Sequence, residues 1–232
     1  MEQNNTPAKT QVYNLVILDK SGSMTDIAEE AIAGYNKTLA TIRAAQRKHI
    51  DTQEHYVSLA AFCGCGIDLI YDRTPVNEAK KLTAKQYEPC CDTPLFDAIG
   101  SSIQRLRYDI KDVEDAAVLV TIITDGYENS SKEYKGPAVK KLIERCKAEG
   151  WMFSFIGAGE DVVKTAQKIS ITNTVVWEQT SEGTRAVFDN ENEAQTRFYA
   201  KMAAPCCACA PVSERKEMRK KFSEEYYDKD EK

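Results

Sequence analysis

The run from Ala116 to Thr124 restricts the fold of this chain more strongly than any other segment. It consists of apolar and β-branched residues and ends in Asp125-Gly126, which is typical of a central parallel strand buried on both faces. A second run, Val12 to Leu18, ends in Asp19 and precedes apolar residues at helical spacing from Met24 to about Lys48. We therefore expect a parallel sheet whose faces are covered by helices.

The remaining segments alternate between strand and helix patterns. Tyr56 to Phe62 and Ile67 to Tyr71 flank a glycine-containing turn of hairpin length, which places one antiparallel strand in the sheet. Helices are expected at Leu95 to Lys111, Pro137 to Glu149, Asp161 to Lys168 and Ser181 to Ala203, and strands at Trp151 to Ile156 and Thr174 to Trp177. This order predicts an α/β fold, a doubly wound, Rossmann-like three-layer sandwich.

The composition favours a single well-buried domain. The chain has 232 residues, of which 42% are hydrophobic and 29% are charged, and this suffices for one large core. We assign residues 1–10 to an N-terminal arm, 11–204 to the domain and 205–232 to a charged, cysteine-containing C-terminal tail. The sequence leaves the order of this tail open.

Charge and the lack of targeting patterns restrict the partners and the location. The net charge is −5, and no stripe of basic and aromatic residues precedes residue 214, which argues against nucleic-acid binding. The sequence shows no export signal and no stretch of roughly 20 apolar residues, so we expect a cytoplasmic protein that does not bind membranes. Its eight cysteines are then expected to be thiols rather than a disulfide framework.

Oxygen-bearing side chains lie at the ends of two of the most apolar strands. Asp19-Lys20-Ser21-Gly22-Ser23 places one carboxylate and two hydroxyls on a strand-to-helix turn, and Asp125 follows the other strand. Because open α/β sheets bind ligands at the carboxyl ends of their strands, we expect the two carboxylates to meet there and to face solvent. Thr93, just before a helix start, joins the same edge or is an ordinary helix cap. Hard oxygen donors of this kind suit Mg²⁺ or Mn²⁺ better than Zn²⁺.

Three segments together resemble a known metal site. Asp-Lys-Ser-Gly-Ser-Met (19–24), Asp-Thr-Pro-Leu-Phe-Asp-Ala-Ile (92–99) and Ile-Thr-Asp-Gly-Tyr-Glu-Asn (123–129) resemble the metal-ion-dependent adhesion site (MIDAS) of von Willebrand factor type A (vWA) domains. The resemblance covers roughly residues 10–204 and is greatest to the stand-alone bacterial members. It implies a mostly parallel six-stranded sheet with one antiparallel edge strand. It also implies five metal-binding residues: Ser21 and Ser23, whose hydroxyls bind the metal directly, and Asp19, Thr93 and Asp125, which act directly or through water.

The chemistry of such a site favours binding to an acidic partner. If neutral hydroxyls occupy inner positions, the metal remains a strong electrophile with an open position, and a Glu or Asp side chain of another protein is the expected ligand. We therefore expect a divalent-metal-dependent protein-interaction module. The alternative is an adaptor subunit of an AAA-type ATPase or of a metal-insertion machine, and the sequence does not separate the two.

A catalytic role is not expected. The two histidines, His49 and His55, should lie at the sheet edge opposite Ser21, so no serine-hydrolase triad forms. In metal-dependent phosphoryl transfer Asp19 is a candidate nucleophile, but Ser21 stands where a second carboxylate is usual, and no obvious base is present. The enzyme class therefore ranks below the interaction module.

Several other polar residues have competing interpretations. We interpret Asp97, Glu128 and Asp161 as helix caps, solvated charges or water-binding groups rather than ligands. Four cysteines can converge at the ligand edge into a zinc or redox site, but their Cys-x-Cys and Cys-Cys spacings suit a tetrahedral site poorly, and separately placed thiols are favoured. These four are Cys63, Cys65, Cys90 and Cys91. Cys146 is expected to be buried, and Cys206, Cys207 and Cys209 have no assigned role.

Overall fold

The central sheet determines where the functional loops lie. The computed structural model describes residues 9–158, 160–178 and 180–228, without the side chains of 160–162. In this part of the chain, six strands form one sheet in the order β3-β2-β1-β4-β5-β6. They are β1 (Thr10–Asp19), β2 (Gln53–Cys63), β3 (Gly66–Pro75), β4 (Ala116–Thr124), β5 (Met152–Ala158) and β6 (Asn173–Trp177). Neighbouring strands are parallel except for the β2-β3 hairpin, which confirms the predicted sheet with one antiparallel edge strand.

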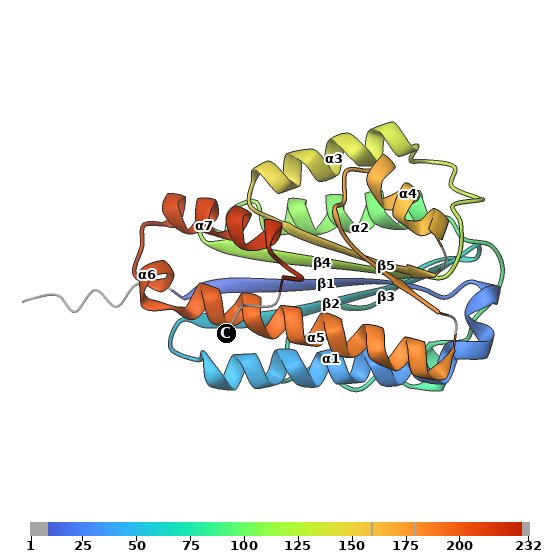
Figure 1. Cartoon of the computed structure of the whole chain (residues 1–232), viewed down its shortest axis with the longest axis horizontal. Coiled ribbons are helices and arrows are strands. Elements are labelled where there is room, and N and C mark those ends of the chain that lie inside the picture. The colour runs from blue at the N-terminus through green and yellow to red at the C-terminus, as the bar shows by residue number, and fades with distance from the viewer. Residues whose placement is uncertain (1–8, 159, 179, 229–232) are drawn as a thin grey trace, which may run out of the picture.

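Helices cover both faces of this sheet (Figure 1). One layer consists of α2 (Leu95–Asp109), α3 (Gly136–Ala148) and α4 (Glu160–Lys168), and the other of α1 (Ala28–Lys48) and α5 (Ser181–Ala203). Side chains of β1 alternate between the two cores: Leu15 and Ile17 pack with α2 and α3, whereas Val12 packs with α1 and α5. The three-layer α/β sandwich predicted from the sequence is therefore confirmed.

The helix predicted from Met24 begins later than expected. Residues Gly22–Ile27 form a 3₁₀ turn, η1, and α1 starts only at Ala28. The backbone before this turn is held from outside the helix, because the Ser21 N–H donates to Asp19 Oδ1 at 2.7 Å and the Gly22 N–H donates to the Cys91 carbonyl at 3.0 Å. These contacts favour a tight turn over a regular first helical turn.

The C-terminal segment is helical where the structure describes it. Residues Pro205–Ala208 form α6 and Val212–Glu224 form α7, which contacts α5 and β5 (Figure 1). Two arginines of α7, Arg215 and Arg219, are buried against Asp115 at the start of β4. Residues 1–8 of the predicted N-terminal arm lie outside the described residues. None of the helices in the described part of the chain combines the length and the apolar character that a membrane crossing requires.

A buried histidine predicts a pH-dependent stability. The imidazole of His55, in β2, contacts Gln53 Oε1 through Nε2 at 2.9 Å, and its Nδ1 has no hydrogen-bond partner among the described residues. Burial, together with a smaller contribution from the nearby His49, lowers the pKa of His55 from 6.5 to about 3. The unfolded chain therefore binds a proton below pH 6.5 that the folded chain excludes, so stability decreases as the pH falls through this value.

We expect this histidine to reduce the free energy of unfolding by about 1.4 kcal/mol between pH 7.5 and pH 5.5. Urea unfolding of the wild type and of His55→Gln at both pH values measures the effect. The two proteins share every other titrating group, so the difference between their pH slopes isolates His55. Equal slopes would contradict a neutral, buried imidazole.

Candidate metal centre

Two neighbouring parallel strands deliver carboxylates to one edge of the sheet. Strands β1 and β4 pair directly, with Leu18 opposite Ile123. Asp19 is the last residue of β1, and Asp125 follows the last residue of β4. Both side chains therefore lie at the carboxyl edge of the sheet, as predicted from the order of the elements.

Asp19 is held in place by three neighbours. Its Oδ1 accepts the Ser21 N–H at 2.7 Å and its Oδ2 accepts the Thr124 hydroxyl at 2.5 Å, while its carbonyl accepts the Tyr87 hydroxyl at 2.5 Å. The expectation that this carboxylate faces solvent is wrong, because Asp19 is 0% exposed and Asp125 only 9%. The η1 turn, the β4 end and Tyr87 close over the strand end.

Burial has an electrostatic consequence for Asp19. It raises the pKa of the Asp19 carboxyl to about 6, although hydrogen bonds from Thr124 and Ser21 favour the ionised form. The nearby Asp125 makes a smaller contribution to this increase. A divalent cation next to this pair would offset the cost of burying two negative charges. The electrostatics therefore fit a cation at this edge.

The hydroxyls of the first loop connect the two aspartates. Ser21 Oγ and Ser23 Oγ lie 3.2 Å apart, and the Ser23 hydroxyl donates to Asp125 Oδ1 at 2.8 Å. Ser21 is buried, whereas Ser23 is exposed. Four of the five predicted ligands thus form one continuous set of polar contacts that opens to solvent on the Ser23 side.

Thr93, the fifth predicted ligand, lies against Gly126. A Cβ atom at Gly126 would lie 2.8 Å from the Thr93 hydroxyl oxygen, so this close approach requires glycine. The Thr93 N–H donates to Asn129 Oδ1 at 2.9 Å, and its carbonyl accepts the Asn129 N–H at 3.3 Å. The structure therefore places Thr93 next to the loop that carries Asp125. We call the five residues Asp19, Ser21, Ser23, Thr93 and Asp125 the candidate metal centre.

Three supporting residues were not predicted to have these roles. Thr124 donates to Asp19, Asn129 fixes the Thr93 backbone, and Tyr87 binds the Asp19 carbonyl. Thr124 and Asn129 lie inside the Ile-Thr-Asp-Gly-Tyr-Glu-Asn segment, so their position beside Asp125 was a usable signal. Tyr87 lies in a polar connection, and its contact depends on the folded path of residues 76–92, for which the sequence carries no local pattern.

Two further acidic residues, Asp97 and Glu128, bind the loop that follows β4. Asp97 accepts the backbone N–H groups of residues 132–134 at 2.7 to 2.9 Å. Glu128 accepts the Phe96 N–H at 2.7 Å and the Ser131 hydroxyl at 2.6 Å. Both carboxylates therefore tie this loop to the start of α2. Glu128 caps α2 through the Phe96 N–H, as one of the interpretations predicted, whereas Asp97 binds loop backbone and caps no helix in the described part of the chain. The side chain of Asp161 lies outside the described residues.

Solved structures share this architecture. Comparison with protein-family models and with curated proteins gave no match. The von Willebrand factor type A structure from Catenulispora acidiphila aligns with 82% of this chain, at 16% sequence identity and a TM-score of 0.57. The chain has a vWA fold. It spans only 43% of the length of the Catenulispora chain.

Two further structures that match this vWA fold hold metals. Manganese-loaded TRAP protein from Plasmodium vivax aligns with 77% of this chain and 72% of its own, at 17% identity and a TM-score of 0.50. Proximal thread matrix protein 1 from the mussel byssus, with a zinc-occupied MIDAS motif, aligns with 83% of this chain and 48% of its own, at 13% identity and a TM-score of 0.51. At these identities the similarity shows the vWA fold alone.

Proposed function

We propose that this chain is a divalent-metal-dependent protein-interaction module. The candidate metal centre holds Mg²⁺ or Mn²⁺ through oxygen atoms, which these hard cations prefer. The observation that carries the proposal is the continuous set of contacts from Asp19 through Ser21 and Ser23 to Asp125 at one sheet edge. The manganese-loaded structure with the same fold supports the choice of metal.

The partner supplies a carboxylate to this metal. Serine and threonine hydroxyls are neutral, so they leave more of the positive charge of the cation uncompensated than carboxylates would. Because Asp19 and Ser21 are buried and Ser23 is exposed, an incoming ligand approaches from the Ser23 side. A Glu or Asp side chain of another protein has the charge and the hard oxygen atoms that this position favours.

The surface beside the metal centre favours a partner that is acidic and partly apolar. Tyr127, two residues after Asp125, is 55% exposed. Tyr127 lines a groove that also contains Phe96, Pro137, Lys140 and Lys168. The groove has one carboxylate, Glu128, whose Oε2 accepts the Phe96 N–H and the Ser131 hydroxyl. The lysines attract acidic segments, and the aromatic rings provide area for an apolar side chain.

We also propose a binding rather than a catalytic role in the cytoplasm. His55 lies near the start of β2 and His49 just after α1, at the sheet edge opposite Ser21, so neither ring reaches the Ser21 hydroxyl as a base. None of the eight cysteines, all of which lie in the described part of the chain, forms a disulfide, which fits a reducing compartment.

Peptide selection tests the proposed interaction directly. We expect random peptides displayed on phage, captured on the immobilised protein in Mn²⁺ and eluted with EDTA, to be enriched in Glu or Asp at one fixed position. The Asp125→Ala protein is the matched control and should enrich nothing that EDTA elutes. Selected peptides that lack an acidic residue, or that stay bound in EDTA, would contradict a carboxylate bridge through the metal.

A further inference from the structure

Two loops bring four cysteines together beside the candidate metal centre. Cys63 is the last residue of β2 and Cys65 lies in the turn between β2 and β3, while Cys90 and Cys91 belong to the loop that precedes Thr93. The Sγ atoms of Cys63 and Cys90 lie 3.2 Å apart, those of Cys65 and Cys91 3.2 Å, and those of Cys65 and Cys90 3.7 Å. The expectation of separately placed thiols is therefore wrong.

These distances suit a single metal ion. Four sulfur atoms in a tetrahedron, each about 2.3 Å from a zinc ion, lie about 3.8 Å from one another. The Sγ atoms of Cys63, Cys65 and Cys90 all lie within 4.8 Å of one another. Cys91 lies outside this group of three and is connected to it through its contact with Cys65. The two shortest contacts, Cys63–Cys90 and Cys65–Cys91, form separate pairs, but Cys65 also contacts Cys90 at 3.7 Å. This third contact joins the sulfur atoms into one cluster, which a shared ion needs and two disulfides do not.

The backbone holds the two loops in this close approach. A Cβ atom at Gly64 would lie 3.0 Å from the Asp92 nitrogen and 3.1 Å from the Cys91 Cβ, so a side chain at Gly64 would push the loops apart. The Cys90 N–H donates to the Lys20 carbonyl at 2.9 Å. Cys91 adopts a φ of 60°, a left-handed conformation that is uncommon outside glycine and is retained where surrounding contacts enforce it.

The local charges also suit a thiolate cluster. Four thiolates around Zn²⁺ carry a net charge of about −2. The Lys20 ammonium interacts electrostatically with Cys63 and Cys90 and also pairs with Asp68. Cys63 is buried, Cys90 is half-buried, and Cys65 and Cys91 are exposed, so a metal can enter from solvent while one side of the cluster is shielded.

We propose that Cys63, Cys65, Cys90 and Cys91 bind one Zn²⁺ ion as a second metal site. On binding, the four thiols lose their protons to solvent and four Zn–S bonds form, with no change in oxidation state. The ion links the β2-β3 turn to the loop that carries Thr93 and thereby fixes the position of Thr93. This last consequence rests on the proposed function, whereas the zinc site itself does not.

Zinc content of the full-length protein tests the site. Protein purified under reducing conditions with Zn²⁺, then desalted, is expected to contain about one zinc ion per chain. The Asp125→Ala variant should keep this zinc, Cys65→Ser should lose it, and Cys209→Ser, an exposed cysteine outside the cluster, should keep it. Cobalt substitution of the wild type should give the sulfur-to-cobalt charge-transfer band of thiolate ligation, a readout that depends on no variant.

Three results would overturn the zinc site. The first is reduced wild-type protein that takes up neither zinc nor cobalt. The second is a mass that shows two disulfides formed within the cluster. The third is zinc that disappears in Asp125→Ala but persists in Cys65→Ser, which would place the ion at the oxygen ligands and support the proposed function instead.

The role in positioning Thr93 has its own measurement. Calorimetric Mn²⁺ titration of the zinc-loaded wild type and of Cys65→Ser is expected to show binding at the candidate metal centre about 10-fold weaker or more in the variant, the usual effect of removing groups that orient a ligand. Cys209→Ser is expected to match the wild type. Equal Mn²⁺ affinities in Cys65→Ser and wild type would overturn this positioning role and leave the zinc site standing.

Discussion

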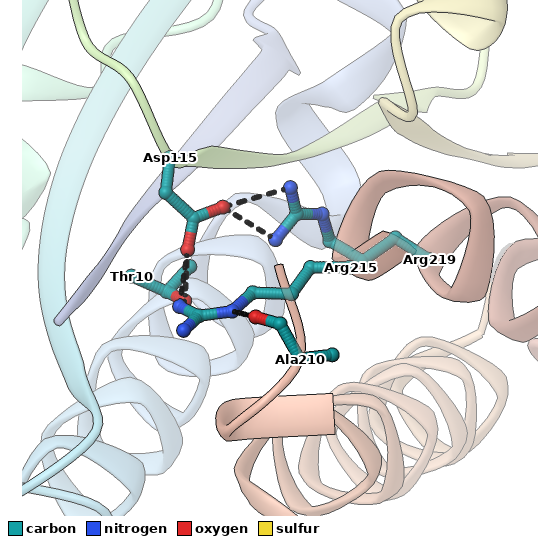
Figure 2. A network of polar contacts seen from close by, with 5 residues as sticks. All are labelled: Thr10, Asp115, Ala210, Arg215 and Arg219. Carbon is teal, nitrogen blue, oxygen red and sulfur yellow. Dashed lines mark hydrogen bonds and ion pairs between the residues drawn. The ribbon is translucent and has the colours of Figure 1, made fainter. Parts of the chain in front are cut away.

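Replacing Asp115 with alanine is expected to lower the free energy of unfolding by about 3 to 5 kcal/mol, the largest stability effect we predict for this chain. Figure 2 shows the reason. Asp115 Oδ2 accepts the Thr10 hydroxyl at 2.6 Å and Arg215 Nη1 at 2.9 Å, while Oδ1 accepts both terminal nitrogens of Arg219 at 3.0 Å. Arg219 is only 1% exposed, so the substitution leaves a buried guanidinium without its counter-charge.

The charge balance around Asp115 favours its ionised form. Burial alone would raise the pKa of this carboxyl, but the hydrogen bonds from Thr10, Arg219 and Arg215 outweigh burial and hold the pKa below its usual range. Because the folded-state pKa is lowered, the stabilisation is present above the unfolded value of 3.8 and is lost as the pH falls below it. The cluster is therefore fully effective at neutral pH.

Urea unfolding at pH 7 measures the effect. The matched control is Asp112→Ala, which removes an exposed carboxylate three residues earlier and is expected to change the free energy of unfolding by less than about 0.5 kcal/mol. If Asp115→Ala cost no more than this control, the α7 arginines would have to be solvated, and the packing of α7 on the domain would be weaker than described.

The second large effect concerns the candidate metal centre. Asp19→Asn is expected to weaken Mn²⁺ and Mg²⁺ binding at least about 100-fold, because it removes the negative charge at the centre of the ligand set. The amide oxygen still accepts the Ser21 N–H, so the loop keeps its conformation. At a metal concentration of 100 times the dissociation constant, the wild type gains about 2.7 kcal/mol of stability, and the variant should gain almost none.

Calorimetric titration of EDTA-stripped protein checks this expectation, with thermal unfolding with and without Mg²⁺ as a second readout. Asp26→Asn serves as the control, since Asp26 is an exposed aspartate in the η1 turn three residues after Ser23. Asp26→Asn should bind metal like the wild type. Saturable binding of equal affinity in Asp19→Asn would exclude Asp19 as a ligand.

The fold was predictable from the sequence wherever the buried apolar residues of a helix or strand recur at the spacing typical of that element. Helix α5 begins and ends as predicted, because Val187, Phe188, Ala194, Phe198 and Met202 recur on its buried face at helical spacing and Thr180 caps its start by accepting the Gly183 N–H at 3.0 Å. Helix α7 was not predicted because its buried face includes Arg215 and Arg219. A helix that is anchored by buried charges lacks the apolar period on which sequence prediction depends.

The candidate metal centre was predictable as a set of residues but not as a geometry. The order of the strands brings Asp19 and Asp125 to one edge, and that order follows from the alternation of elements. The burial of Asp19 depends on Tyr87 and Thr124, which reach it through the folded path of two loops. The contact between the Cys63-Cys65 turn and the Cys90-Cys91 loop likewise depends on a long-range approach that spacing in the sequence does not encode.

The beginnings of β1 and β4 contribute to stability, whereas their ends carry candidate metal ligands. Thr10 and Asp115 anchor α7 at the beginnings of these strands, and Asp19 and Asp125 lie at their ends. Ten residues of strand separate the two groups by about 30 Å, well beyond the screening length of about 8 Å at physiological salt. Substitutions at the two ends should therefore have additive effects on the free energy of unfolding. The loops around the candidate metal centre can therefore change during selection for a new partner without loss of the stability that the Asp115 cluster provides.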